Sequence, residues 1–359
     1  MTRAALAAPG SWRPTLDRWG TFHACAAALP RGALCLVDER VATLHPPVVP
    51  ALTRRASNAV LLLRAGERAK SLAALGRVSE RAARQSRNAP LVVVGGGTLG
   101  DLGTVVAHLA RRGVPLVLVP TTLLAAVDSS VGGKGALHAT SGGRLVKNAW
   151  GCFHYADAAW LCPELWTTLD ARHLRQGAVE AVKMAACLDA GAFARWALAV
   201  PALEQMVRDA RALKARVCHS DPYEITGARR VLNFGHTFGH ALESLTGFRL
   251  AHGDAVAVGM LCALDVGRAA GVTGERLAAE LERILREHLR APGRRRLTGI
   301  LRRCSDDDVA ALLASDKKGA DAGGLNMVLL ERAGRAGTHR IAARAWRRLA
   351  RAWREGVTP

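Results

Sequence analysis

Residues 89–103 read APLVVVGGGTLGDLG, an apolar run that turns directly into a glycine-rich stretch. The apolar half predicts a short buried strand, and the residues that follow predict the start of a helix. Gly95, Gly97 and Gly100 have the G-x-G-x-x-G spacing, which lets a backbone approach a dinucleotide pyrophosphate at a helix N-terminus. The stretch therefore indicates a dinucleotide-binding turn, with a plain tight turn as the alternative interpretation.

The ribose-binding acid that usually follows such a turn after about 20 residues is missing here, since PLVLVPTTLL contains no carboxylate. Contacts to the ribose would have to come from elsewhere in the chain. Asp38 and Glu67 are candidates because each lies at the end of a predicted strand.

Further apolar runs surround this turn and predict a parallel sheet. Short buried strands are expected at 32–40, 58–67, 89–97 and 114–122, and helices at 68–87 and 101–112. Beyond residue 163 the pattern becomes helical, and a strand or hairpin is expected only at 325–332. The predicted helices there are 170–190, 201–219, 224–246, 253–270, 275–290 and 305–315. We therefore expect an α/β chain with a Rossmann-like domain (1–165) and a mostly helical domain (166–359).

Composition narrows the class of protein. The chain has 359 residues, half of them hydrophobic, and no apolar run long enough to cross a membrane. Eight scattered cysteines without a CxxC pair suggest a reduced, cytoplasmic protein without disulfides. The N-terminus lacks the apolar core of a secretory signal.

The net charge of +20 raises the possibility of a nucleic-acid partner. Much of the excess is arginine within 285–304 and 344–355, where it is typical of solvated helix faces, and no nucleic-acid-binding motif accompanies it. A basic nucleic-acid-binding protein remains an alternative that rests on charge alone. Lysines are rare, which suggests that each marks a place where a compact ammonium group is needed. They are Lys70, Lys134, Lys147, Lys183, Lys214, Lys317 and Lys318.

Two segments carry further polar chemistry. The loop 119–138 offers paired hydroxyls, flexible backbone and one lysine, which would suit a phosphorylated or polyhydroxylated ligand, although a structural loop is possible. In QGAVEAVKMAA, Glu180 and Lys183 share a helix face. Taken alone this spacing is typical of a surface ion pair, but the stretch is apolar and rich in alanine.

Three histidines cluster in residues 236–252. His236 and His240 lie at i and i+4 of a predicted helix, and His252 opens the next helix. A single histidine on an apolar helix is usually a core residue, whereas three with a glutamate from another helix fit a divalent cation with open positions. The pattern differs from HExxH, so a zinc protease is not expected.

Together these segments resemble the 3-dehydroquinate synthase family of sugar-phosphate cyclases, over about residues 35–335. The resembling stretches, in family order, are GGGTLGDLG (95–103), RRGVPLVLVPTTLLAAVDSSVGGK (111–134), KNAWGCF (147–153), GAVEAVKMA (177–185), RRVLNFGHTFGHALES (229–244), AHGDAVAVGM (251–260) and DKKG (316–319) followed by LNMVLLERAG (325–334).

The resemblance implies an enzyme that binds NAD and a divalent metal, zinc or cobalt. It would convert 3-deoxy-D-arabino-heptulosonate 7-phosphate, a phosphorylated sugar acid, into 3-dehydroquinate and phosphate, a step of the shikimate pathway. NAD would take a hydride from C5 and return it after phosphate elimination. A homodimer is implied, and no nucleic-acid or membrane partner is expected.

The resemblance also implies a role for individual residues. The metal ligands would be Glu180, His236 and His252. Catalytic contacts would come from Asp128, Lys134, Lys183, Lys214, Arg229, Asn233 and His240. The substrate would meet Asn148, Lys317, Lys318 and Arg112, the last supplied to the neighbouring subunit. NAD contacts would come from Asp38, Glu67, Lys70, Gly95, Gly96, Gly97, Gly100, Asp101, Thr121, Thr122, Lys147 and Thr168.

The chain also departs from the family pattern. The departures are Gly135 for a usual Thr, His138 for Asn, Arg40 for Asn and His173 for Glu, with about four extra residues between Lys134 and Lys147. They leave open another cyclase, acting on sedoheptulose 7-phosphate, glucose 6-phosphate or an amino analogue. A metal-dependent alcohol or glycerol dehydrogenase is a further alternative, which would release NADH.

Overall fold

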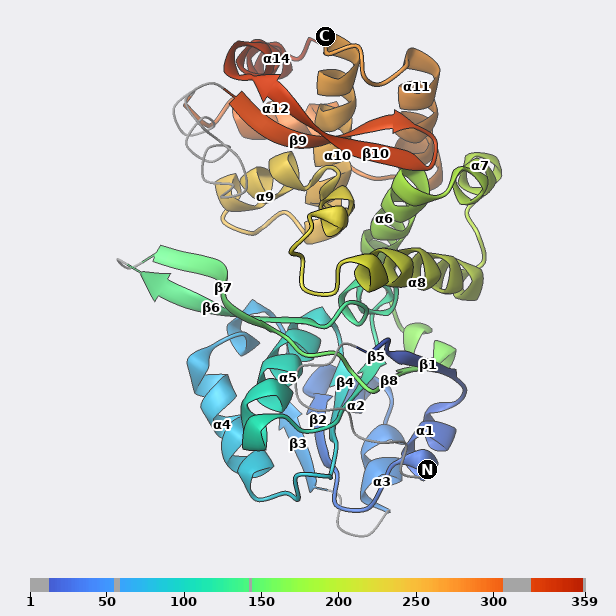
Figure 1. The fold of residues 1–359 in the computed structure, drawn as a ribbon, viewed down its shortest axis with the longest axis vertical. Coiled ribbons are helices and arrows are strands. Elements are labelled where there is room, and N and C mark those ends of the chain that lie inside the picture. Colours follow the sequence, from blue (N-terminus) through green and yellow to red (C-terminus); the bar gives the residue numbers. More distant parts are fainter. Residues whose placement is uncertain (1–12, 55–58, 142–143, 306–323, 358–359) are drawn as a thin grey trace. The chain divides into compact units, whose positions relative to one another are not determined.

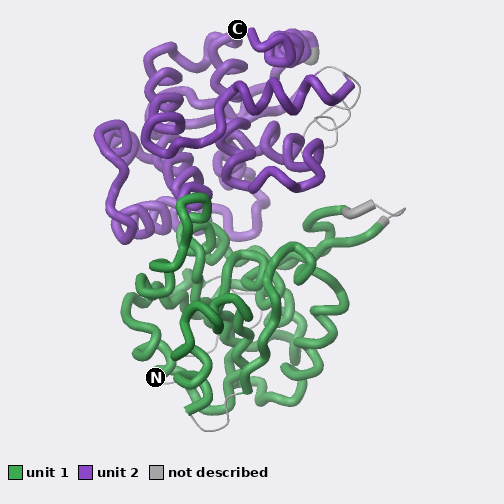
Figure 2. The backbone as a smooth tube through the Cα atoms, turned by 180° about the vertical axis from the view of Figure 1, so that it is seen from behind, with its two compact units in different colours: residues 1–173 green, residues 174–359 purple. Residues whose placement is uncertain are grey.

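The computed structural model describes residues 13–54, 59–141, 144–305 and 324–357, and it divides into two compact units, 1–173 and 174–359 (Figures 1 and 2). The expected architecture is confirmed: a parallel sheet with helices is followed by a mostly helical part. The eight cysteines are all free. Within the described residues, no helix has the length and apolar character needed to span a bilayer.

Unit 1 is built on a six-stranded sheet in the order β1-β8-β5-β4-β2-β3, and every strand pair is parallel (Figure 1). The strands are β1 (Leu16–Trp19), β2 (Leu34–Asp38), β3 (Ala59–Leu63), β4 (Leu91–Gly95), β5 (Leu116–Pro120) and β8 (Ala158–Leu161). The four predicted strands are confirmed. The sequence did not indicate β1 and β8, because four residues are too few to show a periodic pattern.

Helices cover both faces of this sheet and bury its Val- and Leu-rich strands, as a parallel sheet requires. One face packs against α4 and α5, and the other against α1, α2 and α3. The helices are α1 (Phe22–Ala28), α2 (Glu39–Leu44), α3 (Val48–Thr53), α4 (Leu72–Ala83) and α5 (Gly97–Leu109), with short turns η1 (Glu67–Ala69), η2 (Ala110–Arg112), η3 (Ala125–Ser129) and η4 (Pro163–Trp166).

A separate antiparallel hairpin of β6 (Lys134–Ser141) and β7 (Arg144–Phe153) packs on α5. Its contact with α5 explains one departure from the family pattern. A Cβ atom on Gly135 would lie 2.6 Å from Cβ of Thr104 and 3.0 Å from the carbonyl oxygen of Asp101. The larger side chain usual at this position therefore does not fit the backbone of this hairpin.

The described part of unit 2 is mostly helical and contains one hairpin. Its helices are α6 (Ala171–Leu188, which begins in unit 1), α7 (Ala190–Leu198), α8 (Leu203–Ser220), α9 (His236–Leu245), α10 (His252–Ala269), α11 (Glu275–Arg283), α12 (Arg294–Leu301) and α14 (Ala343–Glu355), with turns η5 (Ala228–Asn233) and η6 (Ile284–His288). The hairpin pairs β9 (Gly324–Arg332) with β10 (Arg335–Ala342), as expected near 325–332. The helix predicted at 305–315 falls almost entirely outside the described residues.

Two predictions for unit 2 were wrong in detail. The helix expected over 224–246 is broken at Gly235, whose φ of 77° is left-handed and separates η5 from α9. The helix expected over 275–290 changes at Ile284 from α-helix to a wider π-turn. Neither change alters the apolar pattern, so the sequence pattern alone could not indicate them.

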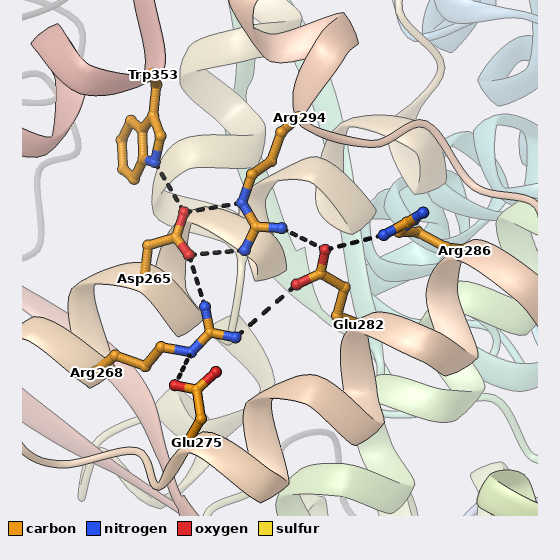
Figure 3. Close-up of polar contacts among 7 residues, drawn as sticks. All are labelled: Asp265, Arg268, Glu275, Glu282, Arg286, Arg294 and Trp353. Atoms are coloured by element: carbon orange, nitrogen blue, oxygen red, sulfur yellow. Dashed lines mark hydrogen bonds and ion pairs between the residues drawn. The ribbon is translucent and has the colours of Figure 1, made fainter. Parts of the chain in front are cut away.

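A buried carboxylate ties α10 to the C-terminal part of unit 2 (Figure 3). Asp265 accepts hydrogen bonds from Nη2 of Arg294 at 2.7 Å, Nε1 of Trp353 at 2.8 Å and Nη1 of Arg268 at 3.3 Å. Arg294 also contacts Glu282 of α11 at 2.5 Å. The interpretation of the basic segments as solvated faces fits the exposed arginines of α14, but it was wrong for Arg294, which joins this network.

Candidate metal centre and glycine-rich turn

Glu180 lies in the middle of α6 with its side chain completely buried. Its Oε2 atom contacts the ammonium group of Lys183, one helical turn later, which is also buried. The interpretation of this pair as a surface ion pair was therefore wrong. Burying a carboxylate without compensation is costly, so its surroundings must supply positive charge.

Two histidine rings face the other oxygen of Glu180. Nε2 of His252 lies 3.4 Å from Oε1 of Glu180, and Nε2 of His236 lies 3.7 Å from it. The ligand atoms of the three residues all lie within 4.8 Å of one another. Ligands about 2.0–2.2 Å from a tetrahedral zinc ion would be spaced by about 3.3–3.6 Å, so the cluster fits a divalent cation.

The second ring nitrogens also fit metal binding. Nδ1 of His236 lies 3.2 Å from the carbonyl oxygen of Phe234, to which it can donate only if it carries the proton. Nδ1 of His252 lies 3.6 Å from Oε2 of the buried Glu243. Such partners fix the ring orientation and leave Nε2 as the ligand atom. Glu243 was not singled out from the sequence, although it lies seven residues after His236 on α9.

Glycines let the three supporting helices approach closely enough to form this cluster. A Cβ atom on Gly259 of α10 would lie 2.0 Å from the carbonyl oxygen of Gly235, just before α9. A Cβ atom on Gly253 would lie 2.5 Å from Cα of Gln176 on α6. His252 and His236 are the first residues of their helices, so close packing at these points sets the distance between the rings.

The electrostatics of the cluster favour a negative Glu180. Burial alone would raise its pKa, but Lys183, His236 and His252 together hold that pKa well below the usual value. Burial, with help from Lys183, lowers the pKa of His236 well below its usual range, so this ring is neutral. Burial also opposes charge on His252, but hydrogen bonds to Glu180 and Glu243 outweigh it and raise its pKa to about 10.

These pKa directions predict that metal binding depends on pH. A raised pKa means that the charged His252 stabilises the metal-free fold, fully below pH ~6.5 and progressively less as the pH rises through about 10. A cation must displace that proton, so its affinity should rise about tenfold per pH unit between pH 7 and 9. Calorimetry in buffers of different ionisation enthalpy should find one proton released per cobalt ion. A pH-independent affinity would contradict this protonation state.

In unit 1, the glycine-rich turn lies at the carboxyl edge of the sheet, where ligands of open α/β sheets bind. Gly95 ends β4, and its carbonyl oxygen accepts from the N–H of Thr121 after β5. A Cβ atom on Gly95 would lie 3.6 Å from that of Asp38, at the end of β2. Gly96, the residue before α5, has no side chain that could cap the helix, and the N-terminus of α5 has the polarity that favours an anion.

Two further glycines of the turn serve packing. A Cβ atom on Gly97 would lie 2.9 Å from Oγ of Ser129, and one on Gly103 would lie 2.3 Å from Cγ2 of Val93. Gly103 therefore allows α5 to lie close to β4. This packing directs the N-terminus of α5 toward the carboxyl edge of the sheet. Gly100 has open space where its side chain would be.

Next to the turn, several predicted NAD and substrate residues form one polar network. Nζ of Lys70 contacts Oδ2 of Asp101 at 2.6 Å and Oδ1 of Asn148 at 2.5 Å. Oε1 of Glu67 lies 3.7 Å from Nζ of Lys147. Burial alone would raise the pKa of Glu67, but Lys147, His138 and Lys70 keep it below the usual value, so this carboxylate is charged. The structure thus brings five predicted residues together.

The remaining predicted residues have varied surroundings. Thr121 is buried, Oγ1 of Thr122 accepts from the N–H of Ala125, and Oγ1 of Thr168 lies 3.0 Å from Nε2 of His45. Arg112 is exposed and has a left-handed φ of 64°. Asp128 lies in η3 and is partly buried. Lys134 is the first residue of β6 and is exposed.

In unit 2, Lys214 of α8 and Arg229 of η5 are buried, and Asn233 ends η5. The ring of His240 lies 5.2 Å from that of His236, beside the cluster, and its residue is exposed. Lys317 and Lys318 lie outside the described residues.

One supporting carboxylate was missed by the sequence analysis. Asp221 is buried after α8 and accepts from the backbone N–H groups of Ile225, Thr226, Gly227 and Arg229 at 2.7–3.3 Å. It thereby fixes the loop that leads to Arg229. Only the pattern of an Asp before a turn signalled such a role.

Comparisons with known proteins match most of the chain. Residues 60–176 match the family described as 3-dehydroquinate synthase N-terminal, and residues 177–319 match 3-dehydroquinate synthase C-terminal. The chain is 39% identical over 326 residues to 3-dehydroquinate synthase of Paracoccus denitrificans, covering 87% of this chain and 86% of that protein.

Two further similarities lie with other cyclases. The chain is 38% identical over 296 residues to 2-epi-valiolone synthase of Actinosynnema mirum, covering 79% of this chain and 76% of that protein. A solved structure of 2-epi-5-epi-valiolone synthase from Streptomyces hygroscopicus, with NAD⁺ and Zn²⁺ bound, is 25% identical, with a TM-score of 0.83 over 98% of this chain and 99% of that one.

Proposed function

The chain belongs to the 3-dehydroquinate synthase family, and from that premise we propose that it is an NAD- and divalent-metal-dependent sugar-phosphate cyclase with the 3-dehydroquinate synthase reaction. It would convert 3-deoxy-D-arabino-heptulosonate 7-phosphate into 3-dehydroquinate and phosphate, a carbon–oxygen lyase reaction. The observation that carries the proposal is the cluster of the buried Glu180 with His236 and His252, in a chain whose two halves match this family.

In this proposal unit 1 binds NAD and unit 2 holds zinc or cobalt. Three protein ligands leave coordination positions open, as catalytic sites do. The bound metal would supply a Lewis acid for substrate oxygens, and NAD would supply a hydride acceptor. The negative Glu180 and the neutral Nε2 atoms of both histidines would hold the cation. Nδ1 of His236 would be held by Phe234 and that of His252 by Glu243, so neither ring would have to reorient.

The chain's cationic groups fit the substrate's charges. Lys183, Lys214 and Arg229 are buried in unit 2, where a poorly hydrated ammonium or guanidinium group interacts strongly with an anion. We propose that they bind the carboxylate, phosphate and developing negative charge of the substrate. A homodimer, in which Arg112 serves the neighbouring subunit, belongs to the same proposal.

The experiment that tests the reaction measures phosphate release from 3-deoxy-D-arabino-heptulosonate 7-phosphate, with NAD and zinc or cobalt, before and after chelation. Metal-dependent release without net NADH would support the proposal. Accumulating NADH would instead indicate a dehydrogenase.

A second candidate is a cyclase that acts on sedoheptulose 7-phosphate. It is favoured by the similar identity to 2-epi-valiolone synthase and by the Gly135 and His138 departures. Absence of phosphate release from the first substrate by folded, metal-loaded protein, together with turnover of sedoheptulose 7-phosphate, would establish this alternative.

A further inference from the structure

His138 lies at an irregular point of the β6–β7 hairpin. Leu137 pairs with Trp150 and Ala139 pairs with Val146, so three residues of β7 lie opposite His138 alone. Asn148, the middle one, has a left-handed φ of 51°. Bulges of this kind redirect side chains and are common near functional sites. Here the bulge brings the backbone of Asn148 against the imidazole ring of His138.

The hydrogen bonds of His138 fix its tautomer. The backbone N–H of Asn148 points at Nδ1 of His138 at 3.1 Å, and an N–H group can only donate, so Nδ1 must be an acceptor. The proton of the neutral ring is therefore on Nε2, which donates to Oε2 of Glu67 at 2.5 Å. The side chain is only 5% exposed, so water does not replace either partner freely.

The two partners of His138 belong to different halves of the polar network. Glu67 also faces Lys147, whereas the side-chain oxygen of Asn148 accepts from Lys70. As part of the proposed function, we assign Glu67 to NAD and Asn148 to the sugar phosphate, the contacts that the resemblance to the family implies. The imidazole ring of His138 thus holds Glu67 through Nε2 and Asn148 through Nδ1.

We infer that His138 is a positioning residue that orients Glu67 for NAD through Nε2 and Asn148 for the sugar phosphate through Nδ1. The inference rests on the proposed function, since it assigns the ligands of Glu67 and Asn148. A purely structural role of the His138 ring would give a different result. In that case, loss of either hydrogen bond would weaken the hairpin to the same extent.

Two substitutions separate the two nitrogens. Asn places its amide oxygen close to the position of Nδ1, so His138→Asn keeps an acceptor for Asn148 and loses the donor to Glu67. Gln places its amide nitrogen near Nε2, so His138→Gln keeps the donor and loses the acceptor. For metal-loaded full-length protein, we expect His138→Asn to raise the Kd for NAD about tenfold with little change in the sugar-phosphate KM. We expect His138→Gln to raise that KM about tenfold and to spare NAD.

The matched control is His339→Gln, because His339 also faces a glutamate, with Nε2 3.0 Å from Oε1 of Glu331, but lies in the β9–β10 hairpin of unit 2. It should change neither constant. Equal changes of both constants in both His138 variants, or no change in either, would overturn the inference. Failure of the proposed function would be recognised separately, because the unmodified protein would then either bind no NAD or release no phosphate from a sugar phosphate.

Discussion

Replacing Glu180 by Gln is expected to abolish stoichiometric metal binding and to reduce cyclase activity by at least about a thousandfold, since a barrier increase of about 4 kcal/mol has that effect. Gln keeps the shape of the side chain but removes the negative charge that both histidines and Lys183 face. Bound metal should be measured by elemental analysis, and activity by phosphate release at saturating NAD.

The same substitution removes the carboxylate charge that Oε2 of Glu180 holds against the buried Lys183, so the metal-free variant should also be less stable than the metal-free parent, by about 3–5 kcal/mol. Glu204→Gln is the control, because this glutamate is exposed on α8 and pairs only with Arg208 among the contacts that the structure describes. A Glu180→Gln protein that keeps one metal ion and most of its activity would show that the site has been wrongly assigned.

Gly259→Ala is expected to destabilise unit 2 strongly. The new Cβ atom would lie 2.0 Å from the carbonyl oxygen of Gly235 and 2.8 Å from the backbone nitrogen of Gly239. Backbone atoms cannot avoid it by changing rotamer, so α9 and α10 must separate. We expect a loss of about 3 kcal/mol or more in the free energy of unfolding, measured by denaturant titration.

Separating these helices should also move His236 away from His252 and weaken metal binding in the protein that remains folded. Gly299→Ala is the matched control, since Gly299 lies in the short helix α12 with open space around its Cβ position. That variant should be unchanged or more stable by up to about 1 kcal/mol. Equal stability of the two variants would contradict the close packing of α9 on α10.

The sequence predicted the parts of the fold that depend on local pattern. The Val- and Leu-rich strands on either side of Gly95 and the start of α10 at His252 followed from periodicity and turn residues. The break before α9 did not, because it depends on a left-handed Gly235 pressed against α10, and no local pattern separates such a glycine from others. Contacts between distant segments decide it.

In the candidate site, too, local features could be predicted from the sequence, whereas contacts between distant segments could not. Spacing alone indicated a metal site among the histidines of 236–252, and the resemblance implied which of them would be ligands. The burial of Glu180 and the roles of Glu243 and His138 could not be predicted. Each depends on partners from another helix or strand, such as Glu180 on α6 for His252 on α10, which lie 72 residues apart.

The Asp265 network sets an order of events during synthesis of the chain. Asp265 leaves the ribosome 88 residues before Trp353, which corresponds to roughly 4–18 s at ~5–20 residues per second. During this interval the carboxylate lacks its indole partner, and the last helix cannot yet cover α9 and α12. The carboxylate of Asp265 on α10 therefore gains its indole hydrogen bond only after residue 353 has been synthesised.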